Sequence, residues 1–329
     1  MKAAIVPEVH GKWQLKDIPI PKPEPNQVLI KMHASGICYT DIHMTQGNLP
    51  ARLPNTLGHE PVGEIVELGQ SVTTRKIGDR VGVPWTQHTC GRCEWCQRGK
   101  SLFCLDQIGT GVNIAGGHAE YMVAYADATQ LLPEGLEYEQ AAPIFCAGYT
   151  VYSGLRIAEP KPHERIAVVG VGGLGHLAIQ YAKVCGFETI AITHSKDKEE
   201  LAYKLGADAV ASDGKGLKKS GGADVILATS NSYKSTSDTL KGLRPDGRLV
   251  LMGLSPGEPL TVTGHLLFGR GRIIGSLQNE REYLYEALDY VAKGKVRVMA
   301  ESFPLDDMNV AYEKVVKGEL RFRAVLKIQ

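Results

Sequence analysis

The sequence has no excess of charge of either sign and no long apolar run. Lys and Arg number 37 against 36 Asp and Glu, a formal net charge of +1. This balance offers no broad electrostatic attraction to nucleic acid or to an acidic membrane, so a small neutral partner suits it better. The sequence contains no run of about 18 apolar residues, so it predicts no membrane-spanning helix. Residues 1–7 lack the features of a signal peptide, so we expect a cytoplasmic protein.

Internal repeats and low-complexity tails are also absent, and 329 residues exceed the usual size of one hydrophobic core. Two domains are therefore expected. Residues 1 to about 135 contain short alternating segments separated by Gly, Pro and Asn, which predicts a β-rich domain with functional loops. The proline-rich residues 19–25 indicate an extended surface connection.

From about residue 149 to 277, continuous apolar segments alternate with helical patterns, which predicts a parallel sheet covered by helices. We expect the last strand, at 324–328, to return to the first domain. The other expected elements are strands at 165–169, 189–193, 223–228, 247–252 and 272–276, and helices at 176–184, 198–205, 235–243 and 283–292.

A glycine motif lies between the first expected strand of this region and its first helix. The motif is G-x-G-x-x-G, and its six residues are Gly170, Val171, Gly172, Gly173, Leu174 and Gly175. In this context it indicates a dinucleotide site, with the pyrophosphate at the helix N-terminus. Gly170 makes the tight turn, Gly172 admits the pyrophosphate, and Gly175 allows close packing. A turn without a ligand is the alternative.

The second expected strand ends without the carboxylate that usually binds the ribose 2′-hydroxyl. In its place stand hydroxyl, imidazole and ammonium groups that can hydrogen-bond and neutralise a 2′-phosphate: Thr193, His194, Ser195, Lys196 and Lys198. NADP(H) is therefore favoured over NAD(H). Alternatively, the two lysines only solvate the next helix, and Asp197 weakens the positive field.

Seven cysteines in a reducing compartment indicate metal or catalytic chemistry more than disulfides. Four of them, Cys90, Cys93, Cys96 and Cys104, have the spacing of a closed tetrahedral zinc site with a structural role. A redox pair or a nucleic-acid-binding zinc ribbon is the alternative, and the charge balance disfavours the ribbon. Cys38, His59 and Cys146 are scattered, and from spacing alone a lone Cys or His is more often a packed residue than a ligand.

These segments resemble the medium-chain zinc alcohol dehydrogenases. The resemblance extends along essentially the whole chain and looks closest to the microbial propanol-preferring and cinnamyl-alcohol-type branches. The motifs that carry it are Gly58-His59-Glu60-Pro61-Val62-Gly63 with Gly69 and Val72, Gly78 to Trp85, the four-cysteine loop, Cys146-Ala147-Gly148 and Gly170 to His176.

The resemblance implies that Cys38, His59 and Cys146 bind a catalytic zinc with one open position, and that Glu60 is an occasional ligand. Together with the four-cysteine site this makes two zinc ions per chain. It also implies that Asp41 orients His59 and raises its basicity, instead of being only a turn residue.

The same resemblance implies a proton relay and a pocket. Thr40 matches the hydroxyl that touches the substrate oxygen, and His43 matches the histidine that ends the relay. From the residues alone, Thr40 is equally a helix N-cap and His43 a surface residue. Leu49 and Trp85 match apolar residues that line the substrate pocket, although either could be plain core.

Two matches concern the cofactor. Thr150 matches a residue that packs on the nicotinamide, and Arg323 matches one that contacts cofactor phosphate. The alternative for Arg323 is a solvated charge at a strand edge.

The implied fold is α/β, with a β-rich, GroES-like catalytic domain (1–148 plus 281–329) and an inserted Rossmann domain (149–280) with a doubly wound parallel sheet. The implied activity is hydride transfer between a small aliphatic or aromatic alcohol or aldehyde and NAD(P), in a homotetramer or homodimer. A zinc-free quinone or enone reductase of the same fold, and a non-catalytic structural or binding protein, are the rival hypotheses.

Overall fold

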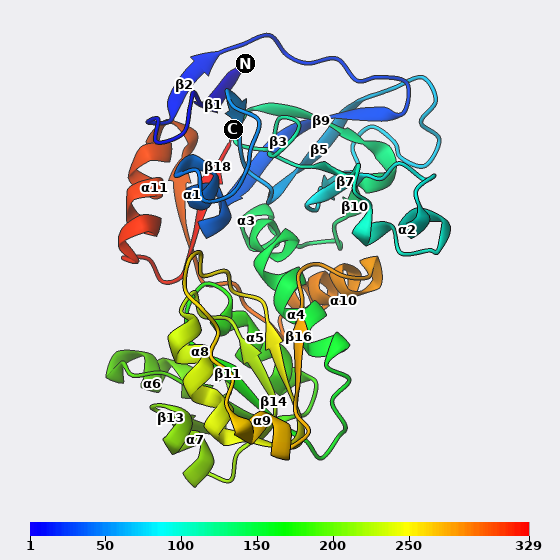
Figure 1. Cartoon of the computed structure of the whole chain (residues 1–329). Coiled ribbons are helices and arrows are strands. Elements are labelled where there is room, and N and C mark those ends of the chain that lie inside the picture. Colours follow the sequence, from blue (N-terminus) through cyan, green and yellow to red (C-terminus); the bar gives the residue numbers. More distant parts are fainter. Residues whose placement is uncertain (329) are drawn as a thin grey trace. The chain divides into compact units, whose positions relative to one another are not determined.

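The computed structural model describes residues 1–328 as two compact units (Figure 1). The first unit combines Met1–Cys146 with the C-terminal segment from Met299, and the second spans Ala147–Val298. No helix among the described residues is long and apolar enough to cross a membrane.

The first unit is built around β3 (Gln27–Ile37), which pairs antiparallel with β5 (Pro61–Leu68), β9 (Tyr121–Tyr125) and β18 (Arg323–Lys327). The main strand order is β10-β6-β5-β3-β18-β17, with β9 on β3. The C-terminal β18, red in Figure 1, thus joins the sheet of the blue β3, and the expected return of the last strand to the first domain is confirmed.

The other helices and strands of this unit are shorter than β3. They are β1 (Lys2–Val6), β2 (Gln14–Asp17), α1 (Tyr39–Thr45), β4 (Asn55–Thr56), β6 (Arg80–Gly82), β7 (Thr86–His88), α2 (Glu94–Gln97), β8 (Ile108–Gly109), β10 (Gln130–Leu131), α3 (Tyr138–Ala141), β17 (Ala300–Pro304) and α11 (Met308–Lys317). Residues 19–25 form no helix or strand, as their prolines predict.

Alternating side chains of β3 explain why it is central. Val28, Ile30 and Met32 point to one face and are fully buried in the core of the unit. Farther along β3, a glycine has no room for a side chain: a Cβ on Gly36 would lie 1.9 Å from Oε2 of Glu60. The strand therefore supplies the core at its start and accommodates a buried carboxylate near its end.

The second unit contains a six-stranded parallel sheet in the order β13-β12-β11-β14-β15-β16, the order of a doubly wound dinucleotide fold. Its strands are β11 (Arg165–Val169), β12 (Glu188–Ile192), β13 (Ala209–Ala211), β14 (Ala223–Ala228), β15 (Leu243–Leu251) and β16 (Arg272–Gly275). Its helices are α4 (Ala147–Ile157), α5 (Gly175–Val184), α6 (Lys196–Lys204), α7 (Gly214–Lys219), α8 (Tyr233–Thr239), α9 (Gly264–Phe268) and α10 (Arg281–Ala292).

The second unit ends later than expected. A return to the first domain at residue 281 was predicted, but α10 belongs to the second unit, which continues to Val298. The physical reason is packing on α4 and α5: Arg156 forms an ion pair with Glu286, and the Tyr181 hydroxyl donates to the carbonyl of Ala287. The first boundary lies between residues 146 and 147, two residues before the expected position.

Four elements of the second unit were not predicted: α4, β13, α7 and α9. The last three have at most six residues each, which is too short for a clear periodic pattern.

Candidate active site

Two thiols, one imidazole and one carboxylate converge in the first unit. Cys38 follows β3 and forms the N-cap of α1, His59 and Glu60 directly precede β5, and Cys146 follows a short 3-10 helix, Ala142–Phe145. Their ligand atoms all lie within 4.8 Å of one another. Cys38, His59 and Glu60 are buried, so strand ends of one sheet bring distant parts of the sequence to one enclosed point.

The spacing of these atoms fits a tetrahedral metal ion. The Sγ atoms of Cys38 and Cys146 are 3.7 Å apart, and Nε2 of His59 lies 3.3 Å from Sγ of Cys146. Metal–sulfur bonds of about 2.3 Å place two sulfurs of a tetrahedral site about 3.8 Å apart. Two sulfurs and one nitrogen leave a fourth position open, which is the donor set of a catalytic zinc site.

Asp41 lies behind this group and is completely buried. Its Oδ2 accepts the backbone N–H of Cys38 at 2.8 Å, and its Oδ1 lies 3.4 Å from Nδ1 of His59. Burial opposes a charge on His59, but Asp41 and the Cys38 thiol outweigh it and raise the imidazole pKa well above its usual value. Asp41 therefore both caps α1 and faces the ring of His59.

Glu60 forms an ion pair with Arg323 of β18, and both side chains are buried. Burial raises the pKa of Glu60 to about 7, although the charge of Arg323 acts to lower it. The interpretation of Arg323 as a solvated charge at a strand edge is wrong, since only 5% of the residue is exposed. A contact with cofactor phosphate stays a prediction.

Thr40 and His43 lie on α1 beside the cluster. Oγ1 of Thr40 is 3.5 Å from Sγ of Cys38, and Cys38, not Thr40, is the N-cap residue of α1. His43 is 8% exposed, so its interpretation as a surface residue is also wrong. Burial lowers its pKa, and its Nδ1 has no hydrogen-bond partner among the described residues.

The two predicted pocket residues differ in their surroundings. The ring of Trp85 meets the ring of His59 edge-on, with centroids 5.3 Å apart, so Trp85 lies directly beside the cluster. Leu49 is half-buried and packs against the hydrophobic core of the first unit. Trp85 thus lies next to His59, whereas Leu49 contributes to the hydrophobic core of the first unit.

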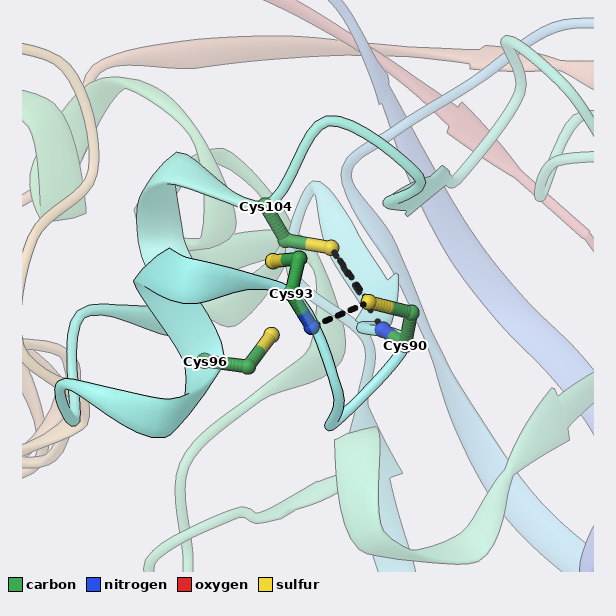
Figure 2. A group of neighbouring side chains, drawn as sticks. All are labelled: Cys90, Cys93, Cys96 and Cys104. Atoms are coloured by element: carbon green, nitrogen blue, oxygen red, sulfur yellow. Dashed lines mark hydrogen bonds between the residues drawn. The ribbon is translucent and has the colours of Figure 1, made fainter.

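The four-cysteine loop carries a second group of thiols, whose sulfurs point toward one centre (Figure 2). The sulfurs of Cys90 and Cys104 are 3.6 Å apart, and the backbone N–H of Cys93 donates to Sγ of Cys90 at 3.3 Å. Backbone N–H groups of Arg92 and Cys93 lower the pKa of Cys90 to about 7, which favours the thiolate that a metal requires. Four sulfurs leave no open position, so this group fits a structural zinc ion.

In the second unit the glycine motif connects β11 to α5. Gly170 has a φ of +89°, and a Cβ on Gly175 would lie 1.8 Å from the carbonyl oxygen of Gly170. A Cβ on Gly172 would meet no atom within 4 Å. Gly173 and Leu174 complete the turn before α5. The first and last glycines are therefore required by the fold itself, whereas Gly172 leaves open space.

The tip of β12 holds Thr193, His194 and Ser195, and Lys198 follows in the first turn of α6. The structure adds a carboxylate from another element: Asp238 of α8, whose pKa is lowered first by Lys241 and also by His194. The electrostatic field at this tip is therefore less positive than the local sequence indicates. Thr150 is a buried residue of α4.

Sequence reasoning missed His118, which is fully buried between the Asp41 carboxylate and Trp13. Burial lowers its pKa to about 4, so the imidazole is neutral at pH 7. No periodic or spacing signal surrounds it, because Gly116 and Gly117 precede it in a loop.

Comparison with known proteins agrees with this architecture. Residues 24–134 match the family model of the alcohol dehydrogenase GroES-like domain, and residues 173–293 match that of the zinc-binding dehydrogenases. An alcohol dehydrogenase from Geobacillus stearothermophilus is 40% identical, with both chains covered completely.

Solved structures are similar along the whole chain as well. A cinnamyl alcohol dehydrogenase from Sorghum bicolor is 30% identical with a TM-score of 0.91, covering 99% of this chain and 97% of that one. The structure of CAD from Helicobacter pylori, complexed with NADP(H), is 27% identical with a TM-score of 0.91 and the same coverage of both chains. The two units and their sites are those of an oxidoreductase, and the second unit has the Rossmann-type fold of nicotinamide-dependent enzymes. The chain belongs to the medium-chain zinc-type alcohol dehydrogenase family.

Proposed function

We propose that this oxidoreductase is a zinc-dependent alcohol dehydrogenase or aldehyde reductase with two zinc sites. Cys38, His59 and Cys146 hold the catalytic ion, and Glu60 is a transient ligand. Cys90, Cys93, Cys96 and Cys104 hold the structural ion. The observation that carries the proposal is the 3.3–3.7 Å spacing of two thiols and an imidazole from three separate segments.

The residues around the first site supply the remaining chemistry. A zinc ion held there would supply Lewis-acid chemistry at the substrate oxygen, and a bound nicotinamide would supply the acceptor or donor of the hydride. The Thr40 hydroxyl receives the substrate proton at Oγ1 and passes one on, since a hydroxyl accepts and donates at once. His43, neutral and with Nδ1 free of protein partners among residues 1–328, accepts a proton at the end of the relay. Asp41 keeps His59 in its orientation.

The two sites are distinguished by a matched pair of serine variants. We expect about two zinc ions per chain in the wild type, measured by elemental analysis. Cys38→Ser should lose the catalytic ion and at least about 1,000-fold in kcat while still binding dinucleotide, because it leaves the second unit intact. Cys90→Ser should mainly lower the melting temperature, because four sulfurs leave no reactive position.

Active Cys38→Ser protein would reject Cys38 as a ligand. A fully folded but inactive Cys90→Ser protein would contradict the division of roles between the two sites. A wild type without zinc but with enone reductase activity would favour the zinc-free reductase instead.

The second proposal is a preference for NADP(H). Complexes with NAD and with NADP both occur among similar solved structures, so the preference rests on this chain's own residues. Thr193, His194, Ser195 and Lys198 provide donors at the tip of β12. Gly170 to Gly175 bind the pyrophosphate, Thr150 packs on the nicotinamide, and Arg323 contacts cofactor phosphate.

The cofactor preference is measured as kcat/KM for NADPH and NADH, with aliphatic, branched and aromatic aldehydes. We expect a higher value with NADPH, and Lys198→Ala should lower it about tenfold for NADPH alone, because only the 2′-phosphate carries the extra charge. Lys204→Ala, at the far end of α6, is the control. Equal losses with both cofactors, or a preference for NADH, would contradict the assignment of Lys198.

We propose, finally, that apolar Trp85 and Leu49 select a small aliphatic or aromatic alcohol or aldehyde. The enzyme is proposed to act as a homo-oligomer, a dimer or a tetramer.

A further inference from the structure

The backbone around His118 is bound to the segment that leads to His59. The N–H of Gly116 donates to the carbonyl of Thr56 at 2.8 Å, and the N–H of His118 donates to the carbonyl of Leu57 at 3.1 Å. On the other side, the N–H of Ala4 donates to the carbonyl of His118 at 2.8 Å. The backbone of His118 is therefore held on both sides, and one of its partners, Leu57, precedes His59 by two residues.

The ring of His118 has little freedom to move. Its Nδ1 lies 2.9 Å from Oγ of Ser35, and its centroid is 5.3 Å from that of Trp13. A Cβ on Gly58 would lie 2.5 Å from Nδ1, so only glycine leaves room for the ring. Gly58 also has a φ of +96°, a second reason for glycine.

The other ring nitrogen faces Asp41. Nε2 of His118 lies 4.0 Å from Oδ2 of Asp41 and has no hydrogen-bond partner among the described residues. Asp41 accepts backbone N–H groups from Cys38 at 2.8 Å and Gly58 at 3.3 Å, and its Oδ1 lies 3.4 Å from Nδ1 of His59. A carboxylate has about four acceptor positions, so it can serve two backbone groups and two imidazoles.

A buried polar nitrogen without a partner is destabilising, and Asp41 is the acceptor that it faces. When the Ser35 hydroxyl donates to Nδ1, the single proton of a neutral imidazole is on Nε2, directed at Asp41. A donation from Nε2 to Asp41 would oppose rotation of the carboxylate away from His59. The orientation of His59 would then depend on a histidine that lies outside the ligand cluster.

We propose that His118 is a positioning residue that donates from Nε2 to Asp41 and so holds the carboxylate against His59, which strengthens metal binding. This inference rests on the proposed function, because it requires a metal ion at Cys38, His59 and Cys146. The competing explanation is a histidine that only fills space next to Trp13.

Three substitutions separate these explanations. His118→Phe keeps the ring volume and removes both nitrogens. His118→Gln places an amide donor near the position of Nε2, whereas His118→Asn places it near Nδ1. The measured quantity is the competition of zinc-loaded protein with a chelator, followed as zinc released per chain, and the four-cysteine site of the same molecule serves as the internal reference.

We expect His118→Phe to weaken zinc binding at the first site about 10- to 100-fold, the usual effect of losing a group that orients a ligand, without change at the four-cysteine site. His118→Gln should restore most of the affinity and His118→Asn should not. Equal affinity of wild type and His118→Phe, or of the Gln and Asn variants, would overturn the proposal. If His118→Phe does not fold, the comparison of Gln with Asn decides.

A double-mutant cycle tests the path through Asp41. In an Asp41→Asn background, His118→Phe should have less than about a third of its effect on the zinc dissociation constant, because the acceptor is already altered. Additive losses would overturn the proposed path. Absence of zinc from this site in the wild type would instead refute the proposed function, so the two failures are distinguishable.

Discussion

Glu164 and Arg248 form a buried ion pair in the second unit, with exposed fractions of 8% and 4%. Arg248 lies in β15, and its guanidinium also donates from Nε to the carbonyl of Ala158 at 3.0 Å. The hydrogen bond from Arg248, with that from the N–H of Lys161, lowers the pKa of Glu164 from 4.5 to about 2, although burial opposes this. The pair therefore joins the end of α4, the start of β11 and β15.

The first prediction at the residue scale concerns this pair. Because the pKa of Glu164 is lower in the folded state, its stabilisation is complete above about pH 4.5 and is lost as the pH falls toward 2. Glu164→Gln should lower the free energy of unfolding by about 3 kcal/mol at pH 7, since it leaves a buried guanidinium without a charge partner. Urea unfolding from pH 7 to pH 3 measures the difference between the two proteins.

That difference should shrink below pH 4.5, and a constant difference would contradict the assignment. Acid protonates metal ligands in both proteins, so only the difference is interpreted. Glu188→Gln is the control: its partner is Arg165 at 2.7 Å, but 49% of its side chain is exposed, so the loss should be below about 1 kcal/mol.

At the scale of elements, the turn between β11 and α5 contains two glycines with different roles. Packing requires Gly175, whereas we predict that a ligand requires Gly172. Gly175→Ala should lower stability by about 1–3 kcal/mol, because its Cβ would lie 1.8 Å from the Gly170 oxygen. Gly172→Ala should leave the melting temperature unchanged, because its Cβ would meet open space, yet weaken dinucleotide binding at least about tenfold. Thermal unfolding and calorimetric titration with NADPH measure both.

A Gly172→Ala protein that binds NADPH normally would place the pyrophosphate elsewhere. A Gly175→Ala protein with wild-type stability would show that α5 can shift away from β11.

At the scale of the whole molecule, the proposed homo-oligomer needs an interface, and we predict it at the edge of the parallel sheet. Among the described residues β16 is an edge strand of this sheet, and three apolar side chains near it in the sequence are exposed: Leu267 (76%), Phe268 (88%) and Leu277 (72%). Phe268→Lys combined with Leu277→Lys should reduce the molar mass measured by light scattering, because two charges disfavour burial.

Leu105→Lys in the four-cysteine loop, where Leu105 is 87% exposed, is the control. A monomeric wild type would refute the oligomer, and an unchanged mass of the double variant would place the interface elsewhere.

Local sequence patterns and family motifs were sufficient to predict the parallel sheet of the second unit and the position of the four-cysteine group. Apolar runs in β11, β12, β14 and β15 predicted the parallel sheet, because strands that are buried on both faces need apolar side chains at successive positions. The spacing of Cys90 to Cys104 indicated its site directly, because all four ligands lie in one loop.

Tertiary structure alone decided what depends on long-range packing. Residues 281–298 belong to the second unit because α10 packs on α4, a contact with no local signal. Arg323 is paired with Glu60, and His118 faces Asp41, because β18 and the loop before β9 come to lie beside residues more than 70 positions away. A buried charge or imidazole is recognised only from the groups around it, and those groups are assembled by the fold.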